Sequence, residues 1–173
     1  MDHLPHTVGG RGNAPSIGAE ARLAMLGLVL PPPRPPVGNF TPAVRCGGLC
    51  FLSGQGPVDT EGVRRTGLVG DGPSIAEARD HARLTMLNLL SALREEIGSL
   101  DSVARIVRLF GMINATEMFD RHPEVIGGAT DLLCDVFGTD IGRGAGVAVG
   151  LGSLPSGITV EIEMVVAVDY EEE

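Results

Sequence analysis

The chain has 173 residues, and its 22 acidic and 13 basic side chains give a formal net charge of −9. All 13 basic residues are arginine, which excludes reactions that need a lysine, such as Schiff-base formation or a lysine-containing phosphate loop. The acidic balance also disfavours a nucleic-acid partner, because phosphate binding depends on clustered positive charge. Any chemistry must therefore come from carboxylates, arginines, histidines, thiols or backbone amides.

The composition predicts one globular domain with an aliphatic core, since 43% of the residues are hydrophobic and only 3% are aromatic. No apolar run approaches the roughly 20 residues that cross a bilayer, and the N-terminus does not resemble a signal peptide. We therefore expect a cytoplasmic protein with no membrane partner. Three cysteines predict reduced thiols, with Cys46 and Cys50 buried. The histidine and cysteine spacings indicate no metal site, and His81 and His122 are interpreted as surface or capping residues.

Residues 1–38 are expected to form an arm that precedes the domain. Residues 1–15 lack periodicity and are predicted to be flexible, whereas residues 16–25 favour a short helix. Five prolines within residues 31–36 exclude a helix or a central strand and indicate an extended segment. A stiff spacer is favoured over a ligand for an SH3-type domain.

Residues 39–170 carry the pattern of a single domain, with residues 171–173 left as an acidic tail. The Gly47-Gly48 pair between two short apolar runs predicts a β-hairpin. Apolar residues at helical spacing follow Ser74 and Glu77, which have the spacing of a capping box. The predicted elements are strands at 44–46 and 49–53, a helix at 75–97, a strand at 103–113, a helix at 124–137, and strands at 146–151 and 159–169.

The order ββαβαββ predicts an α+β sandwich, in which one mixed sheet carries both helices on a single face. The strands are apolar on both faces, so the face without helices must be covered by something else. We therefore expect a homo-oligomer.

Two features of the last strands have a bearing on chemistry. Glu161 and Glu163 alternate with apolar residues, so both carboxylates point to one face, roughly 7 Å apart. They are either solvent-facing charges or an acid/base pair with raised pKa at an interface. Gly144, Gly146, Gly150 and Gly152, with Ala148 between them, occupy the even positions of the preceding strand and leave one face nearly bare, for tight packing or for a ligand. Neither pattern identifies a reaction.

Four motifs occur together in one order. They are Asn39-Phe40-Thr41-Pro42-Ala43-Val44-Arg45, Leu52-Ser53-Gly54-Gln55-Gly56-Pro57, Asn114 after the central strand, and Leu154-Pro155 followed by Val160-Glu161-Ile162-Glu163. The combination resembles the RidA (YjgF) family of reactive-intermediate deaminases, which is also known as the endoribonuclease L-PSP family. The likeness extends from about Glu20 to Val168 and is to a longer-chain branch of that family.

The resemblance implies a chorismate-mutase-like fold and a homotrimer whose three clefts lie between subunits. Members of the family hydrolyse imines and enamines such as 2-aminoacrylate to a 2-oxo acid and ammonia, without a metal or cofactor. In such sites an arginine holds the substrate carboxylate as a bidentate clamp. By resemblance, Glu161 is the catalytic residue that positions or activates water, and Ser53, Gly54 and Asn114 line the pocket.

Two family positions are changed in this chain. The clamp position, fifteen residues before Glu161, is Gly146, and a tyrosine that often flanks the pocket is Phe40. Arg143 can replace the clamp only if the glycine-rich segment around it bends, and Arg45 is a second candidate. We therefore expect a deaminase with an altered substrate preference. The alternative is a non-catalytic trimer that binds a small metabolite or has a regulatory role.

Overall fold

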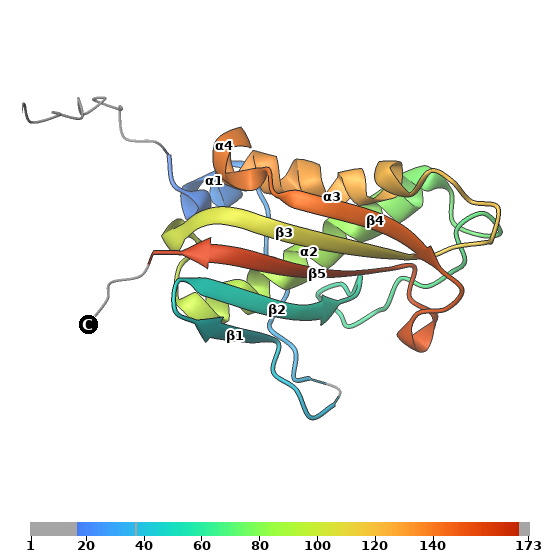
Figure 1. Cartoon of the computed structure of the whole chain (residues 1–173), viewed down its shortest axis with the longest axis horizontal. Helices are drawn as coiled ribbons and strands as arrows, with labels where there is room; N and C mark the ends of the chain where they lie inside the picture. The colour runs from blue at the N-terminus through green and yellow to red at the C-terminus, as the bar shows by residue number, and fades with distance from the viewer. Residues whose placement is uncertain (1–16, 37, 170–173) are drawn as a thin grey trace, which may run out of the picture.

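One mixed sheet of five strands, with helices on one face, forms the body of the molecule (Figure 1). The structure is a computed structural model and describes residues 17–36 and 38–169. The segments predicted at 1–15 and 171–173 lie outside the described residues. The elements are α1 (Ala19–Met25), β1 (Ala43–Cys46), β2 (Leu49–Gln55), α2 (Ile75–Ile97), the 3-10 helix η1 (Leu100–Ser102), β3 (Val103–Asn114), α3 (His122–Phe137), α4 (Thr139–Gly142), β4 (Ala145–Leu151), the 3-10 helix η2 (Pro155–Gly157) and β5 (Val160–Val168).

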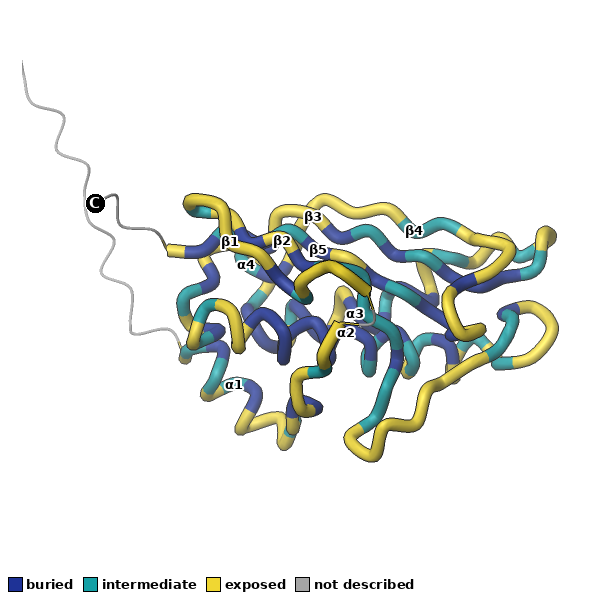
Figure 2. Tube along the Cα trace, turned by 90° about the horizontal axis from the view of Figure 1, so that it is seen from below, coloured by how far each residue is buried: buried dark blue, intermediate teal, exposed yellow. Residues whose placement is uncertain are grey.

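The strands lie in the order β1-β2-β5-β3-β4 across the sheet. β3 and β4 are parallel, whereas the other neighbouring strands are antiparallel. The chain passes through α2 between β2 and β3 and through α3 between β3 and β4, and both helices lie on the same side of the strands (Figure 2). The predicted ββαβαββ order and the α+β sandwich with one helix-covered face are thus confirmed.

The long helix α2 begins and ends where local sequence signals place it. The Ser74 side chain accepts a hydrogen bond from the Glu77 backbone, and the Glu77 carboxylate accepts one from the Ser74 backbone. Gly98, with φ of 82°, ends the helix, because this backbone conformation favours glycine. The helix stripe that faces the sheet is fully buried and aliphatic, and it includes Met86, Leu89, Leu90 and Leu93.

The helices α2 and α3 pack closely because α3 has a glycine at their contact. A Cβ on Gly128 would overlap the Arg79 carbonyl oxygen and lie 2.9 Å from its carbonyl carbon. On the sheet side of α3, Gly111 of β3 similarly leaves room for Ile126. Small residues at these points therefore set the distance between the layers.

The sheet has one buried face and one open face. On β5, Val160, Ile162, Met164 and Val166 are buried under the helices, whereas Glu161 and Glu163 alternate with them toward the open face. The prediction that the two carboxylates share a face is confirmed. The open face also carries exposed apolar side chains, namely Val44, Leu49, Phe51, Val147 and Leu151.

The described part of the arm packs against the helix layer. Asp101 Oδ1 accepts a hydrogen bond of 3.1 Å from the Glu20 backbone, and Glu20 Oε1 accepts one of 3.1 Å from the Leu100 backbone. This reciprocal pair holds α1 against η1, with Leu23 buried. Farther along the arm, the Ser91 hydroxyl at the buried side of α2 donates to the Pro31 carbonyl at 2.6 Å.

The structure corrects several local predictions. The helix α3 begins at His122, and the single turn α4 follows Gly138 where no element was predicted. Cys46 is exposed on the edge strand β1, so the prediction that it is buried is wrong, although Cys50 is buried. His81 is half-buried rather than at the surface, and its Nδ1 lies 3.1 Å from the Thr159 hydroxyl oxygen. Among the described residues, no helix is both long and apolar enough to cross a bilayer.

Candidate functional site

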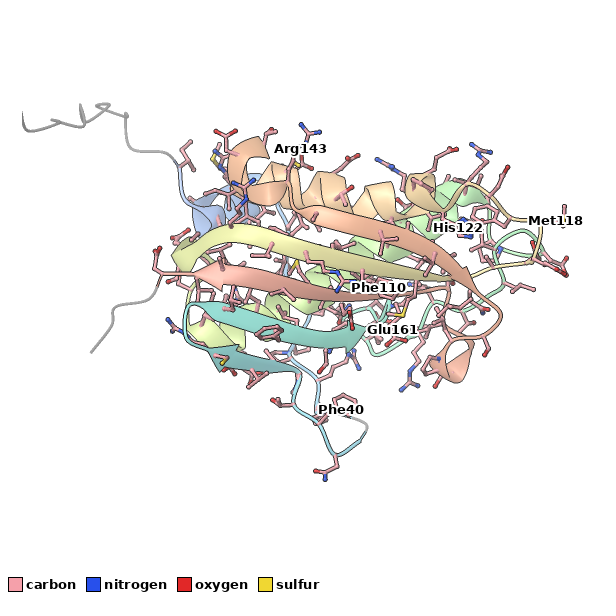
Figure 3. All side chains as sticks on the ribbon, viewed as in Figure 1. Phe40, Phe110, Met118, His122, Arg143 and Glu161 are labelled. Carbon is pink, nitrogen blue, oxygen red and sulfur yellow. The ribbon has the colours of Figure 1, made fainter. Side chains whose placement is uncertain are left out.

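The open face of the sheet carries a groove of about 480 Å³, a volume typical of small-molecule sites. β2, β3 and β5 form its floor, and the segment before β1 forms one side. Figure 3 shows Phe110 over the middle of the sheet and Phe40 on the segment that precedes β1. The lining includes Phe40, Phe51, Ser53, Arg108, Phe110 and Glu163.

A β-bulge adjoins the groove and positions Glu161. In the pairing of β2 with β5, Leu52 lies opposite Met164 and Gln55 opposite Ile162, so Ser53 and Gly54 face the single residue Glu163. Such a bulge kinks the strand and redirects its side chains, and bulges are frequent beside active sites. Gly54 thereby comes so close to Glu161 that a Cβ on Gly54 would overlap the carboxylate oxygen Oε1.

The Glu161 carboxyl has the electrostatic setting of a proton acceptor. Partial burial raises the pKa of Glu161, and the like charge of Glu163 on the same face raises it further. Within residues 17–36 and 38–169, the Glu161 carboxylate accepts no hydrogen bond and pairs with no cation. A carboxylate with raised pKa and no partner is a stronger base than a paired one, so it can accept a proton from water.

Ser53 and Asn114 are engaged with backbone groups. The Ser53 hydroxyl donates to the Thr41 carbonyl at 2.7 Å, which ties the bulge to the segment that carries Phe40. The buried Asn114 side chain donates through Nδ2 to the Gly67 carbonyl at 3.0 Å. Asn114 lies at the end of β3, beyond the level of Glu161, and outside the lining of the groove.

The position of the missing clamp lies on the opposite side of the sheet from Glu161 within one chain. Gly146 pairs with Leu109, which is buried under the helices, and parallel partners point to the same face. Arg143 is exposed beside α4, and Figure 3 shows it away from Glu161 at the β4 edge of the sheet. Arg45 donates to the Asp169 carbonyl at 2.7 Å and does not line the groove. A single chain therefore brings neither predicted arginine to Glu161.

Arg108 is the arginine that the structure brings to the groove, and the sequence-based prediction missed it. Its Cζ lies 5.8 Å from the centroid of the Phe110 ring. In the part of the chain that the structure describes, its guanidinium has no hydrogen-bond or ion-pair partner. The signal that could have found it is the alternation of Arg108, Phe110, Met112 and Asn114 toward one face of β3.

The site offers no recognisable ligand set for a metal ion. Among the described residues, no three side chains of histidine, cysteine, aspartate or glutamate cluster in a way that could hold one. The chemistry available from these side chains is acid/base transfer at a carboxyl and anion binding by a guanidinium.

Sequence and structure comparisons give relatives for most of the chain. The chain is 36% identical over 146 residues to protein TCP17 of Trypanosoma cruzi, covering 84% of this chain and 91% of that protein. The crystal structure of Atu1372 from Agrobacterium tumefaciens, a protein of unknown function, has a TM-score of 0.79 and 34% identity, with 87% of this chain and 94% of that chain covered. E. coli TdcF with bound serine, at 23% identity, has a TM-score of 0.55, with 81% of this chain and 94% of TdcF covered, and shares the fold.

A family model also matches most of the chain. It is described as "YjgF/chorismate mutase-like, putative endoribonuclease" and matches residues 20–155. Its match spans the arm helix, both large helices and four of the five strands. The resemblance to the RidA (YjgF) family is therefore confirmed, and this chain belongs to the YjgF/chorismate-mutase-like family.

Proposed function

We propose that this protein hydrolyses an imine or enamine metabolite to a 2-oxo product and ammonia, with Glu161 as the base that activates water. The observation that carries the proposal is the half-buried Glu161 carboxylate, which has no partner among the described residues, has a raised pKa and lies beside the Ser53–Gly54 bulge. Membership of the YjgF family supports the processing or binding of a small metabolite. Because Gly146 stands at the family's clamp position, we propose a substrate preference different from that of clamp-bearing relatives.

The proposed reaction needs only water and a proton carrier. Glu161 accepts a proton from water as the oxygen bonds to the imine carbon, and it passes that proton on to the imine nitrogen. The hydroxyl proton of the resulting carbinolamine is then transferred to its nitrogen as the carbon–nitrogen bond breaks, so a carbonyl compound and ammonia are released. Each imine thus consumes one water and yields one ammonia. An enamine enters the same route after it tautomerises to the imine.

We further propose that the active form is a homotrimer with clefts between subunits, as in the family that the chain resembles. The exposed apolar side chains of β4 on the open face, Val147 and Leu151, support this proposal, because they lie outside the groove and a second copy would remove them from water. Light scattering on the purified protein tests it, since a monomer would contradict a site built between subunits.

RNA cleavage is not part of the proposal, although the family description mentions an endoribonuclease. The net charge of −9 opposes the approach of a polyanion, and Arg108 is the one arginine among the groove-lining residues.

The experiment that tests the proposed reaction follows ammonia release from 2-imino acids generated in the assay by an amino-acid oxidase. Glu161→Ala should lower the enzymatic rate by about 10²–10⁴-fold, the usual contribution of a general base. Glu95→Ala is the matched control, because Glu95 is exposed on α2, on the other side of the sheet. Equal rates for wild type and Glu161→Ala would refute the role of Glu161. Ligand binding without any hydrolysis would favour the non-catalytic metabolite-binding alternative.

A further inference from the structure

The groove concentrates the aromatic residues of a chain that has very few. Only five phenylalanines occur in the 173 residues, and Phe40, Phe51 and Phe110 all line this groove. Phe40 is 53% exposed and Phe51 is 42% exposed, although phenylalanine side chains are favoured in the interior. A ligand with an apolar body would cover these rings.

The same groove contains one cation and one carboxylate, neither of which is paired with any residue that the structure describes. In β3 and β5, Arg108 pairs with Val165 and Phe110 with Glu163, so Arg108 and Glu163 are diagonal neighbours, about 7–8 Å apart. Within the described residues they form no ion pair with each other or with a third side chain. A guanidinium fits a carboxylate in bidentate fashion, and a glutamate fits a protonated nitrogen.

We propose that the groove binds imines or enamines derived from amino acids with an aromatic or other large apolar side chain. The substrate carboxylate lies on Arg108, its nitrogen faces Glu163, and its side chain packs against Phe40, Phe51 and Phe110. This assignment rests on the proposed function and names its substrate class. Arg108 takes the role of the clamp that Gly146 does not supply.

Ring stacking supports the orientation of the ligand. The Arg108 guanidinium already lies near the face of Phe110, and such a contact reduces the freedom of the side chain before a ligand arrives. The carboxylate end therefore has a defined position, and the apolar end extends toward the exposed rings of Phe51 and Phe40. A small side chain, such as that of alanine, would leave those rings in contact with water.

The test measures binding of phenylpyruvate and pyruvate by calorimetry, and hydrolysis of the imines that an amino-acid oxidase makes from phenylalanine and alanine. Phenylpyruvate should bind at least about tenfold more tightly than pyruvate, because a methylene-sized difference in an apolar pocket is already worth about tenfold or more. Arg108→Gln should weaken the binding of both 2-oxo acids by about tenfold or more, as expected for a lost charge-assisted pair.

Matched variants separate the groove from its surroundings. Phe51→Ala should bring the affinity for phenylpyruvate close to that for pyruvate, whereas Leu49→Ala, on the same strand and face but outside the groove, should not. Arg105→Gln, on the strand of Arg108 but outside the groove, is the control for charge. Thermal unfolding and light scattering establish that each variant is folded and has the wild-type oligomeric state.

Equal affinity for the two 2-oxo acids, or wild-type binding by Arg108→Gln, would overturn the assignment. Loss of phenylpyruvate binding in both Phe51→Ala and Leu49→Ala, together with a changed oligomeric state, would also overturn it, since the rings would then serve a subunit interface. Hydrolysis of the alanine-derived imine without preference for the aromatic one would refute the substrate class and leave the hydrolase standing. Selective phenylpyruvate binding without hydrolysis would refute the hydrolase and uphold the ligand class.

Discussion

The substitution Gly54→Ala tests whether the position of the Glu161 carboxylate matters for the reaction. A Cβ at Gly54 would overlap Glu161 Oε1 and lie 3.0 Å from Cδ and 3.1 Å from Cγ. These three nearest atoms all belong to the end of one flexible side chain, and Gly54 does not have a positive φ. The backbone can therefore keep its path while the carboxylate moves.

The size of the effect follows from that displacement. Oε1 must move by more than about 1 Å to reach an ordinary contact, and a misplacement of about 1 Å already costs on the order of 10²-fold in rate. The free energy of unfolding should change by less than about 1 kcal/mol, because two small contributions oppose each other. The lower entropy of the unfolded alanine chain stabilises by about 0.4–1 kcal/mol. The shifted Glu161 rotamer costs about 0.5–1.5 kcal/mol.

The assay compares kcat/KM for imine hydrolysis with the midpoint of thermal unfolding in the same preparations. Gly152→Ala is the control, because a Cβ there would meet no atom within 4 Å and Gly152 does not have a positive φ. It should retain both activity and stability. A Gly54→Ala variant with the wild-type rate would refute the reasoning, since the displaced carboxylate would then have no bearing on catalysis.

Three further outcomes are expected. The rate should fall on acidification, with its midpoint above the ordinary range for a glutamate, and Glu163→Gln should move that midpoint in the pH–rate profile to lower pH by removing a like charge. Because the folded-state pKa of Glu161 is raised, protonated Glu161 stabilises the folded protein, and this stabilisation is lost as pH rises through that pKa. Denaturant unfolding should therefore show Glu161→Gln to be more stable than wild type at neutral pH. The difference in free energy of unfolding should disappear below the ordinary pKa range of glutamate. Gly128→Ala should lower the free energy of unfolding by about 1–3 kcal/mol in the same assay, because the added Cβ meets the Arg79 backbone. Gly127→Ala should leave the free energy of unfolding unchanged or raise it by up to about 1 kcal/mol, because its Cβ meets only the movable end of the Arg79 side chain.

Elements with strong local signals were predictable from the sequence. The helix α2 follows from the capping box at Ser74 and from apolar residues at regular spacing, and both are properties of one segment. The turn α4 is different, because its N-cap Gly138 provides no side-chain hydrogen bond and four residues are too few for a periodic pattern. Its formation depends on α3 and β4, which fix the two ends of the segment.

The candidate site was only partly predictable, because it depends on irregular strand pairing. Glu161 was found from its motif, but its contact with Gly54 requires the bulge in β2, which no local pattern reveals. Arg108 was missed for a similar reason. The pairing of β3 with β5 shifts between Ile106 and Arg108, so an alternation counted from the buried Ile106 places Arg108 on the covered face.

The spacing of charges along β3 and β5 explains why Glu161 would act through water. Arg108 is level with Val165, four residues from Glu161 along β5, which corresponds to about 13 Å of strand. In a 2-imino acid the reacting carbon is bonded to the carboxylate carbon, so a carboxylate held by Arg108 keeps that carbon near the level of Glu163. Glu161 does not line the groove itself, so in the proposed complex its carboxylate would act on that carbon through an intervening water rather than by direct contact, as a general base does. Glu163 lies between the two and faces the nitrogen, which becomes the leaving ammonia.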